Sequence, residues 1–131
     1  MNIVLDCSGA FEIILQKEKA HLYAELLRNA DWVAAPDLYK IECMSALCDY
    51  TSTGEISKEE ALGKQDELFG LIDEFTDPSE NITEAFSEAV RLRQNVRSMM
   101  YFTLARRLGA VLLTSDHSLA SLAEKEGVTV R

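Results

Sequence analysis

The sequence predicts an α/β fold, a three-layer α/β/α sandwich built around a mainly parallel sheet. Short apolar runs at residues 3–5 and 111–115 alternate with helical patterns, and each run leads into an aspartate, Asp6 or Asp116. Such runs are typical of buried parallel strands. With 131 residues and a hydrophobic fraction of 47%, we expect one domain, residues 1–131, with its own core.

The first half of the chain predicts a strand, two helices, a second strand and two further helices. Pro36 ends the second strand, and Asp37 after it is predicted to cap the next helix. Ser57 and Glu60 have the spacing of a capping box, which opens a long acidic helix. The expected strands are residues 2–6 and 32–35, and the expected helices are residues 8–16, 18–30, 37–50 and 57–72.

The second half continues the alternation. A short strand is expected at residues 74–76 before Pro78, and Gly109 is expected to end the second of two helices. The expected later elements are helices at 82–93, 95–108 and 117–126, a strand at 110–115 and an edge strand at 128–130. This order of elements implies helices on both faces of the sheet.

Charge is unevenly distributed along the chain, whose net charge is −9. Residues 55–88 contain eleven acids and two lysines, whereas residues 89–115 contain five arginines and no acid. An acidic protein is a poor candidate for nonspecific duplex binding, because neutralisation of phosphates dominates nucleic-acid affinity. The arginine segment can still guide a phosphodiester locally, although solvated helix faces explain both clusters equally well.

Several classes of protein are disfavoured. No apolar run approaches the roughly 18–20 residues that span a bilayer, and the first residues lack the basic start of a secretory signal. We therefore expect a cytoplasmic protein without a membrane partner. Cys7, Cys43 and Cys48 are an odd number, which argues against a disulfide framework. A mixed cysteine and carboxylate zinc site is the alternative, but the spacings match no zinc motif, so we expect structural thiols.

Three acids form the best candidate for a functional site. Asp6 and Asp116 follow predicted strands, and Glu42 lies on a predicted helix between them. Ligands in open α/β sheets gather at the carboxyl ends of strands, and carboxylate oxygens suit Mg²⁺. The alternative is structural, with both aspartates capping helices and Glu42 solvated on its helix.

Three segments, in order along nearly the whole chain, resemble a known family. They are Val4-Leu5-Asp6-Cys7-Ser8, Pro36-x-Leu38-x-x-x-Glu42-x-x-x-Ala46-Leu47, and Tyr101-x-x-Leu104-Ala105-x-x-x-Gly109-x-x-Leu112-Leu113-Thr114-x-Asp116. The chain resembles a PIN domain of the VapC type, the toxin half of toxin–antitoxin pairs. The third segment is the most specific of the three.

The resemblance implies a PIN-like fold and a metal-dependent endoribonuclease. Asp6, Glu42 and Asp116 would then be the catalytic acids and the ligands of Mg²⁺ or Mn²⁺. Implied partners are an RNA substrate, a small antitoxin with a basic segment and a second copy forming a homodimer. The family has a further acid three residues before the tyrosine that Tyr101 matches, and this chain has Ser98 there.

Ser98 changes the expected electrostatics. A carboxylate about 4 Å from a unit charge contributes roughly 4 kcal/mol of gross attraction at an effective dielectric near 20. A serine hydroxyl can ligate Mg²⁺ in its place, and Asn95 on the preceding turn can offer a carbonyl oxygen. We therefore expect Ser98 to be a metal ligand, one metal rather than two, and reduced activity.

Neighbouring residues have expected supporting roles. Ser8 and Thr114 are expected to position Asp6, a water or Asp116 through hydrogen bonds, with local capping as the alternative. Asn95 is expected to support the metal ligands as well. Arg91, Arg93 and Arg97 are expected to bind RNA.

Two other functions remain open. A catalytically degraded PIN domain that binds RNA or protein predicts the same fold without turnover. A phosphate-handling α/β enzyme of another family is disfavoured, because Asp6-Cys7-Ser8 lacks the second aspartate of a haloacid-dehalogenase-like pair and no glycine-rich phosphate loop exists.

Overall fold

The computed structural model describes all 131 residues and contains a four-stranded sheet in which every strand pair is parallel. The strand order is β3-β2-β1-β4, so β1 lies inside the sheet. Ile3 of β1 is opposite Val33 on one side and Val111 on the other. The strands are β1 (Asn2–Leu5), β2 (Trp32–Pro36), β3 (Glu74–Thr76) and β4 (Val111–Leu113).

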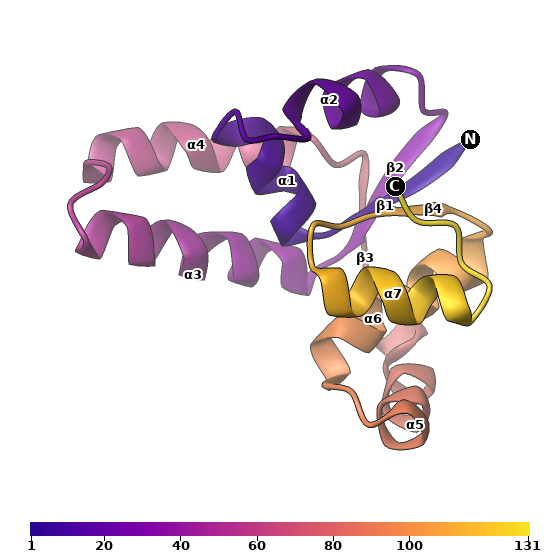
Figure 1. The fold of residues 1–131 in the computed structure, drawn as a ribbon. Helices are drawn as coiled ribbons and strands as arrows, with labels where there is room; N and C mark the ends of the chain where they lie inside the picture. Colours follow the sequence, from indigo (N-terminus) through magenta and orange to yellow (C-terminus); the bar gives the residue numbers. More distant parts are fainter.

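Helices cover both faces of this sheet, which confirms the predicted α/β/α layers (Figure 1). The α1–α4 group lies on one side, and α5–α7 lie on the other, where α6 packs against β1, β2 and β4. None of the helices has the length and apolar character needed to cross a membrane. The helices are α1 (Cys7–Ile14), α2 (Ala20–Arg28), α3 (Leu38–Ser52), α4 (Lys58–Gly70), α5 (Ile82–Leu92), α6 (Val96–Leu108) and α7 (His117–Lys125), with a 3₁₀ turn η1 (Pro78–Glu80).

Most predicted helix ends are confirmed, with one exception. Ser57 and Glu60 form both bonds of the capping box, and Gly109 ends α6 in a left-handed conformation. Asp37 precedes α3 but makes no capping bond. Its backbone is already helical, with φ −59° and ψ −25°, whereas a capping residue needs an extended backbone. The Asp37 carboxylate pairs instead with Lys40 at 2.9 Å.

The predicted edge strand at 128–130 is reduced to a single parallel bridge between Val130 and Leu112. Leu112 donates its amide to the carbonyl of Thr129 at 2.9 Å and accepts the amide of Arg131 at 3.1 Å. The pairing does not extend back to Ala110, because the amide of Ala110 is bonded to the carbonyl of Ala105 at the end of α6.

Gly9 is the residue that lets α1 approach the end of β4. A Cβ atom built at Gly9 would lie 2.7 Å from the carbonyl oxygen of Leu113 and 3.0 Å from Cδ1 of Leu5. The first distance is too short for a real contact with backbone, so any side chain here displaces the helix or the strand. Because Gly9 has no side chain, the start of α1 can lie close to the strand ends near the candidate acids.

Gly9→Ala should reduce the free energy of unfolding by about 1–3 kcal/mol, because it overpacks this contact. Gly63→Ala in α4 is the matched control, since no atom lies within 4 Å of its added Cβ. It should stabilise the protein by about 0.5–1 kcal/mol, the usual gain of alanine over glycine in a helix. Urea denaturation of both variants checks this pair, and an equal effect of the two would contradict the contact described.

Candidate functional site

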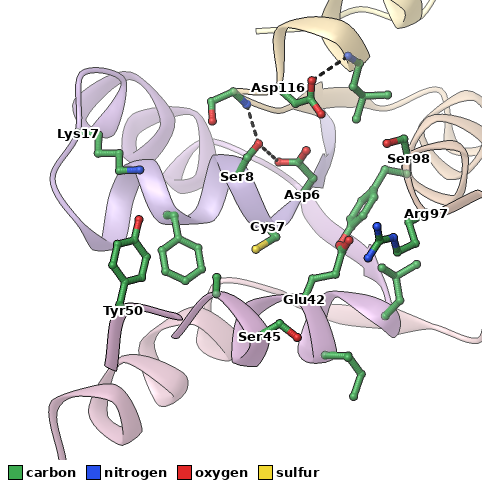
Figure 2. Close-up of a pocket in the computed structure, with 17 residues that line it drawn as sticks. Asp6, Cys7, Ser8, Lys17, Glu42, Ser45, Tyr50, Arg97, Ser98 and Asp116 are labelled. Carbon is green, nitrogen blue, oxygen red and sulfur yellow. Dashed lines mark hydrogen bonds between the residues drawn. The ribbon is translucent and has the colours of Figure 1, made fainter. Parts of the chain in front are cut away.

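A pocket of about 620 Å³ opens at the carboxyl ends of β1 and β4, between α1, α3 and α6 (Figure 2). The structure brings all four predicted metal-site residues, Asp6, Glu42, Ser98 and Asp116, into its lining. These residues come from four separate parts of the chain. The pocket therefore joins residues that are far apart in the sequence.

Asp6 is the most constrained of the acids. Only 6% of the residue is exposed, and both carboxylate oxygens accept hydrogen bonds. Oδ1 accepts from the amide of Gly9 at 2.8 Å and from the hydroxyl of Ser8 at 2.7 Å, while Oδ2 accepts from the hydroxyl of Thr114 at 2.5 Å. The Gly9 bond caps α1, so the structural role considered for Asp6 is real and coexists with its place in the pocket.

Burial raises the pKa of Asp6 from 3.8 to about 6, although the bonds from Thr114, Gly9 and Ser8 oppose this shift. The negative charge of Glu42 raises the pKa further. None of the ion pairs in the structure includes Asp6, Glu42 or Asp116. The pocket therefore contains a buried carboxylate with no cationic side chain paired to it.

Ser8 and Thr114 connect the two strand ends, as predicted for residues that position the acids. The Ser8 hydroxyl accepts the amide of Ser115 at 2.9 Å and lies 3.2 Å from the hydroxyl of Thr114. The Thr114 hydroxyl accepts the amide of Asp116 at 3.1 Å. Through these contacts the loop after β4 is attached to the start of α1.

Glu42 is held by a residue to which the sequence reasoning assigned no role. The hydroxyl of Tyr101 donates to Oε1 of Glu42 at 2.6 Å. Burial and the adjacent Glu42 raise the pKa of Tyr101, so its hydroxyl remains a hydrogen-bond donor at neutral pH. Tyr101 follows Ser98 by three residues on α6, so both lie on the same helix face. This spacing could have predicted that Tyr101 faces the site.

Asp116 lies at the exposed edge of the pocket and caps α7. Its Oδ1 accepts the amides of Ser118 at 3.0 Å and Leu119 at 3.2 Å, while Oδ2 accepts no hydrogen bond. As with Asp6, the capping alternative and the site position are both realised. A carboxylate held through one oxygen leaves the other available for a ligand.

Asn95 does not offer its side-chain oxygen to the pocket, and it contacts the site only indirectly, through Ser98. Its side-chain oxygen accepts the amide of Ser98 at 2.7 Å and so caps α6, and Asn95 does not line the pocket. The first turn of a helix has amides without partners, and the asparagine oxygen satisfies one of them. Ser98, three residues later, does reach the pocket.

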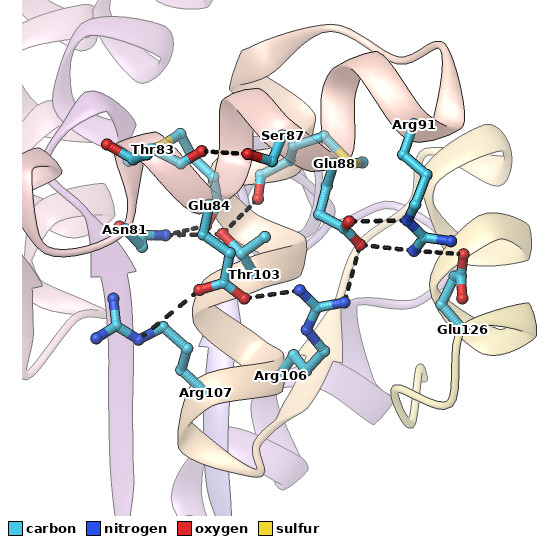
Figure 3. A network of polar contacts seen from close by, with 12 residues as sticks. Asn81, Thr83, Glu84, Ser87, Glu88, Arg91, Thr103, Arg106, Arg107 and Glu126 are labelled. Carbon is cyan, nitrogen blue, oxygen red and sulfur yellow. Dashed lines mark hydrogen bonds and ion pairs between the residues drawn. The ribbon is translucent and has the colours of Figure 1, made fainter.

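Of the three arginines predicted to bind RNA, only Arg97 lines the pocket. Arg91 instead pairs with Glu88 at 2.7 Å and with Glu126 at 2.9 Å (Figure 3). Arg93 ends α5 in a left-handed conformation with φ 57°. The predicted group of three therefore does not form one surface at the site.

The acids of α5 neutralise much of the arginine segment (Figure 3). Glu88 accepts from Arg91 and from Arg106, and Arg106 also pairs with Glu84 at 2.7 Å. The hydrogen bond from Arg91 lowers the pKa of Glu88 to about 2. This network joins α5, α6 and the end of α7, so its arginines have a structural explanation.

The cysteines are all free thiols. Cys7 lines the pocket and Cys43 is buried. The neighbouring Cys43 thiol and burial raise the pKa of Cys7 well above its usual range, which keeps the thiol neutral in the metal-free protein. This supports the expectation of structural thiols.

The pocket offers oxygen ligands of the kind that a hard divalent cation prefers, but the acids do not lie close enough together to bind one as they are arranged. The Oε2 of Glu42 and the Oδ2 of Asp116 accept no hydrogen bond, and oxygen ligands suit Mg²⁺ and Mn²⁺. As arranged, no three His, Cys, Asp or Glu side chains are close enough together to hold a metal. A shared ion therefore requires Glu42 or Asp116 to turn toward Asp6, which its hydrogen bonds hold in place.

Comparison with known proteins establishes the fold alone. No family model and no curated protein matches the chain. The structure is similar to the crystal structure of PAE2754 from Pyrobaculum aerophilum, with a TM-score of 0.77 and 20% sequence identity over 99% of this chain and 92% of that one. This likeness supports the α/β architecture over the full length of the chain.

The raised pKa of Asp6 predicts a pH-dependent cost to stability. The folded value of about 6 exceeds the ordinary value of 3.8, so the folded state binds the proton more tightly. The resulting stability is fully present below pH 3.8 and is lost as pH rises through 6. Compared with Asp6→Asn, the metal-free protein should show a free energy of unfolding that falls by about 3 kcal/mol between pH 3.5 and pH 7.5.

Urea denaturation of both proteins in chelator, over this range of pH, measures the difference. The asparagine variant is the reference because it removes the titration while keeping the size of the side chain. A difference between the two proteins that does not change with pH would contradict the burial of an unpaired carboxylate at this position.

Proposed function

We propose that the protein is a Mg²⁺- or Mn²⁺-dependent endoribonuclease of the VapC toxin type, with reduced activity. One observation carries the proposal: the buried Asp6 carboxylate has no cationic partner and lies in one pocket with Glu42 and Asp116. Such unbalanced negative charge at strand ends favours a bound cation. The resemblance of the three motifs to PIN domains supplies the reaction.

The residues of the pocket would have separate roles in phosphodiester hydrolysis. A bound divalent ion supplies an activated water and neutralises charge on the phosphate. Asp6 is the fixed ligand, because three hydrogen bonds hold its carboxylate. Glu42 and Asp116 each offer a free oxygen, and Arg97 at the pocket wall is placed to bind a phosphate oxygen.

Ser98 explains why we expect reduced rather than full activity. It lines the pocket, but its hydroxyl carries no charge to attract the metal or a second ion. A carboxylate there would add roughly 4 kcal/mol of gross attraction at an effective dielectric near 20. The RNA substrate, an antitoxin with a basic segment and a homodimer are proposed on the resemblance.

The test is cleavage of a mixed pool of tRNA and structured RNA in Mg²⁺ or Mn²⁺. Asp6→Asn should lower the initial rate by about 100-fold or more, beyond the 10–100-fold usual for residues that merely support a metal ligand. Asp49→Asn on α3 is the matched control and should leave the rate unchanged, because Asp49 is exposed and does not line the pocket. Chelator should abolish cleavage.

Ser98→Asp should raise the rate about tenfold or more, since it restores a carboxylate beside the other acids. Equal rates for this variant and the native protein would refute the role given to Ser98. Cleavage by Ser98→Asp alone would instead identify the native chain as a PIN-like fold that binds RNA or protein without turnover.

A further inference from the structure

The pocket extends well beyond the acids to a second end formed by different residues. In Figure 2, Asp116, Ser98 and Arg97 lie at one end, whereas Lys17 and Tyr50 lie at the other. Its volume of about 620 Å³ is within the range of about 300–1,000 Å³ found for small-molecule sites. A metal ion with its ligands does not account for the far end.

Aromatic rings form the wall of that end. Phe11 of α1 and Tyr50 of α3 are stacked, with ring centroids 5.8 Å apart and an angle of 24° between the ring planes. Phe11 is buried and Tyr50 is half-buried, and both line the pocket. Phe11 therefore packs against the Tyr50 ring at the wall of the pocket, where an aromatic ring can stack on a planar ligand.

The charges of the pocket are also distinctive. Lys17 and Arg97 are the cationic residues of its lining, and neither side chain takes part in an ion pair or hydrogen bond. Arg91 and Arg106, by contrast, are paired with acids on α5. The Tyr50 hydroxyl points toward Lys17 in Figure 2. A free cation beside an aromatic wall matches a ligand with both a planar ring and an anionic group.

We propose that this end of the pocket is a nucleobase subsite, in which Tyr50, backed by Phe11, stacks on one unpaired base and Lys17 binds the adjoining phosphate. The proposal rests on the proposed nuclease function and specifies its substrate as single-stranded RNA. Bases inside a duplex are stacked on one another and cannot enter such a pocket, whereas unpaired bases commonly stack on aromatic side chains. The next phosphate along the strand would then lie at the acids and Arg97.

The test uses binding in chelator, so that it does not depend on cleavage. The probes are a labelled tetranucleotide of single-stranded RNA and four versions of it, each lacking the base at one position. Fluorescence anisotropy with the Asp6→Asn protein gives the affinity of each. Tyr50→Leu in this background should weaken binding of the intact probe about tenfold, the typical effect of removing one stacking ring.

A double-mutant cycle distinguishes stacking from a general loss of structure. Tyr50→Leu should have little effect on the one probe that lacks the stacked base, because the interaction is already absent there. Tyr50→Phe keeps the ring and should bind as tightly as its parent. Lys17→Gln should weaken all five probes to a similar extent, and thermal unfolding should show that each variant is folded.

The outcomes separate the subsite from the nuclease. Base-dependent binding through Tyr50 in a protein that cuts no RNA supports the subsite and refutes the nuclease. Cleavage with the same KM and binding in Tyr50→Leu as in the parent refutes the subsite and leaves the nuclease intact. Equal weakening of every probe by Tyr50→Leu, or no measurable binding of any probe, also overturns the subsite.

Discussion

The carboxylate of Asp6 is buried at the end of an interior strand of the sheet without a cationic side chain paired to it, and this charge constrains everything around it. Hydrogen bonds from Ser8, Gly9 and Thr114 stabilise the charge only in part, because its pKa remains near 6. The same bonds attach α1 to the loop after β4. A buried, unpaired carboxylate of this kind is typical of a functional site, and it supports the function that we propose.

The other residues of the pocket complement the fixed carboxylate of Asp6. Glu42 of α3 and Asp116 at the start of α7 line the same pocket, and each keeps one oxygen free of hydrogen bonds. Tyr101 restrains Glu42 without neutralising its charge. At the far end, the stacked rings and Lys17 provide a surface suited to a base and its phosphate. We propose that this one cavity binds both a cation and a nucleotide.

The fold and the acids were predictable from local patterns, whereas contacts between distant residues were not predictable. The position of Asp6 after β1 and the capping box at Ser57 depend on a few adjacent residues, and the sequence predicts them correctly. The strand before Asp116 is shorter than predicted, because β4 ends at Leu113 and Asp116 caps α7. The pairing of Arg91 with Glu126 joins residues 35 positions apart. No local pattern distinguishes that arginine from Arg97, which faces the pocket. Nor does any local pattern bring Lys17 into the cavity.

We propose that Asp6, Glu42 and Asp116 share one divalent ion, which Mn²⁺ binding measured by calorimetry and electron paramagnetic resonance can detect. We predict one ion per chain, bound more weakly as pH falls through 6 because Asp6 becomes protonated. Replacing any of the three acids by its amide should weaken binding, and Asp49→Asn should not. Binding that is unaffected in all three variants, or no binding to the native protein, would refute the shared ion.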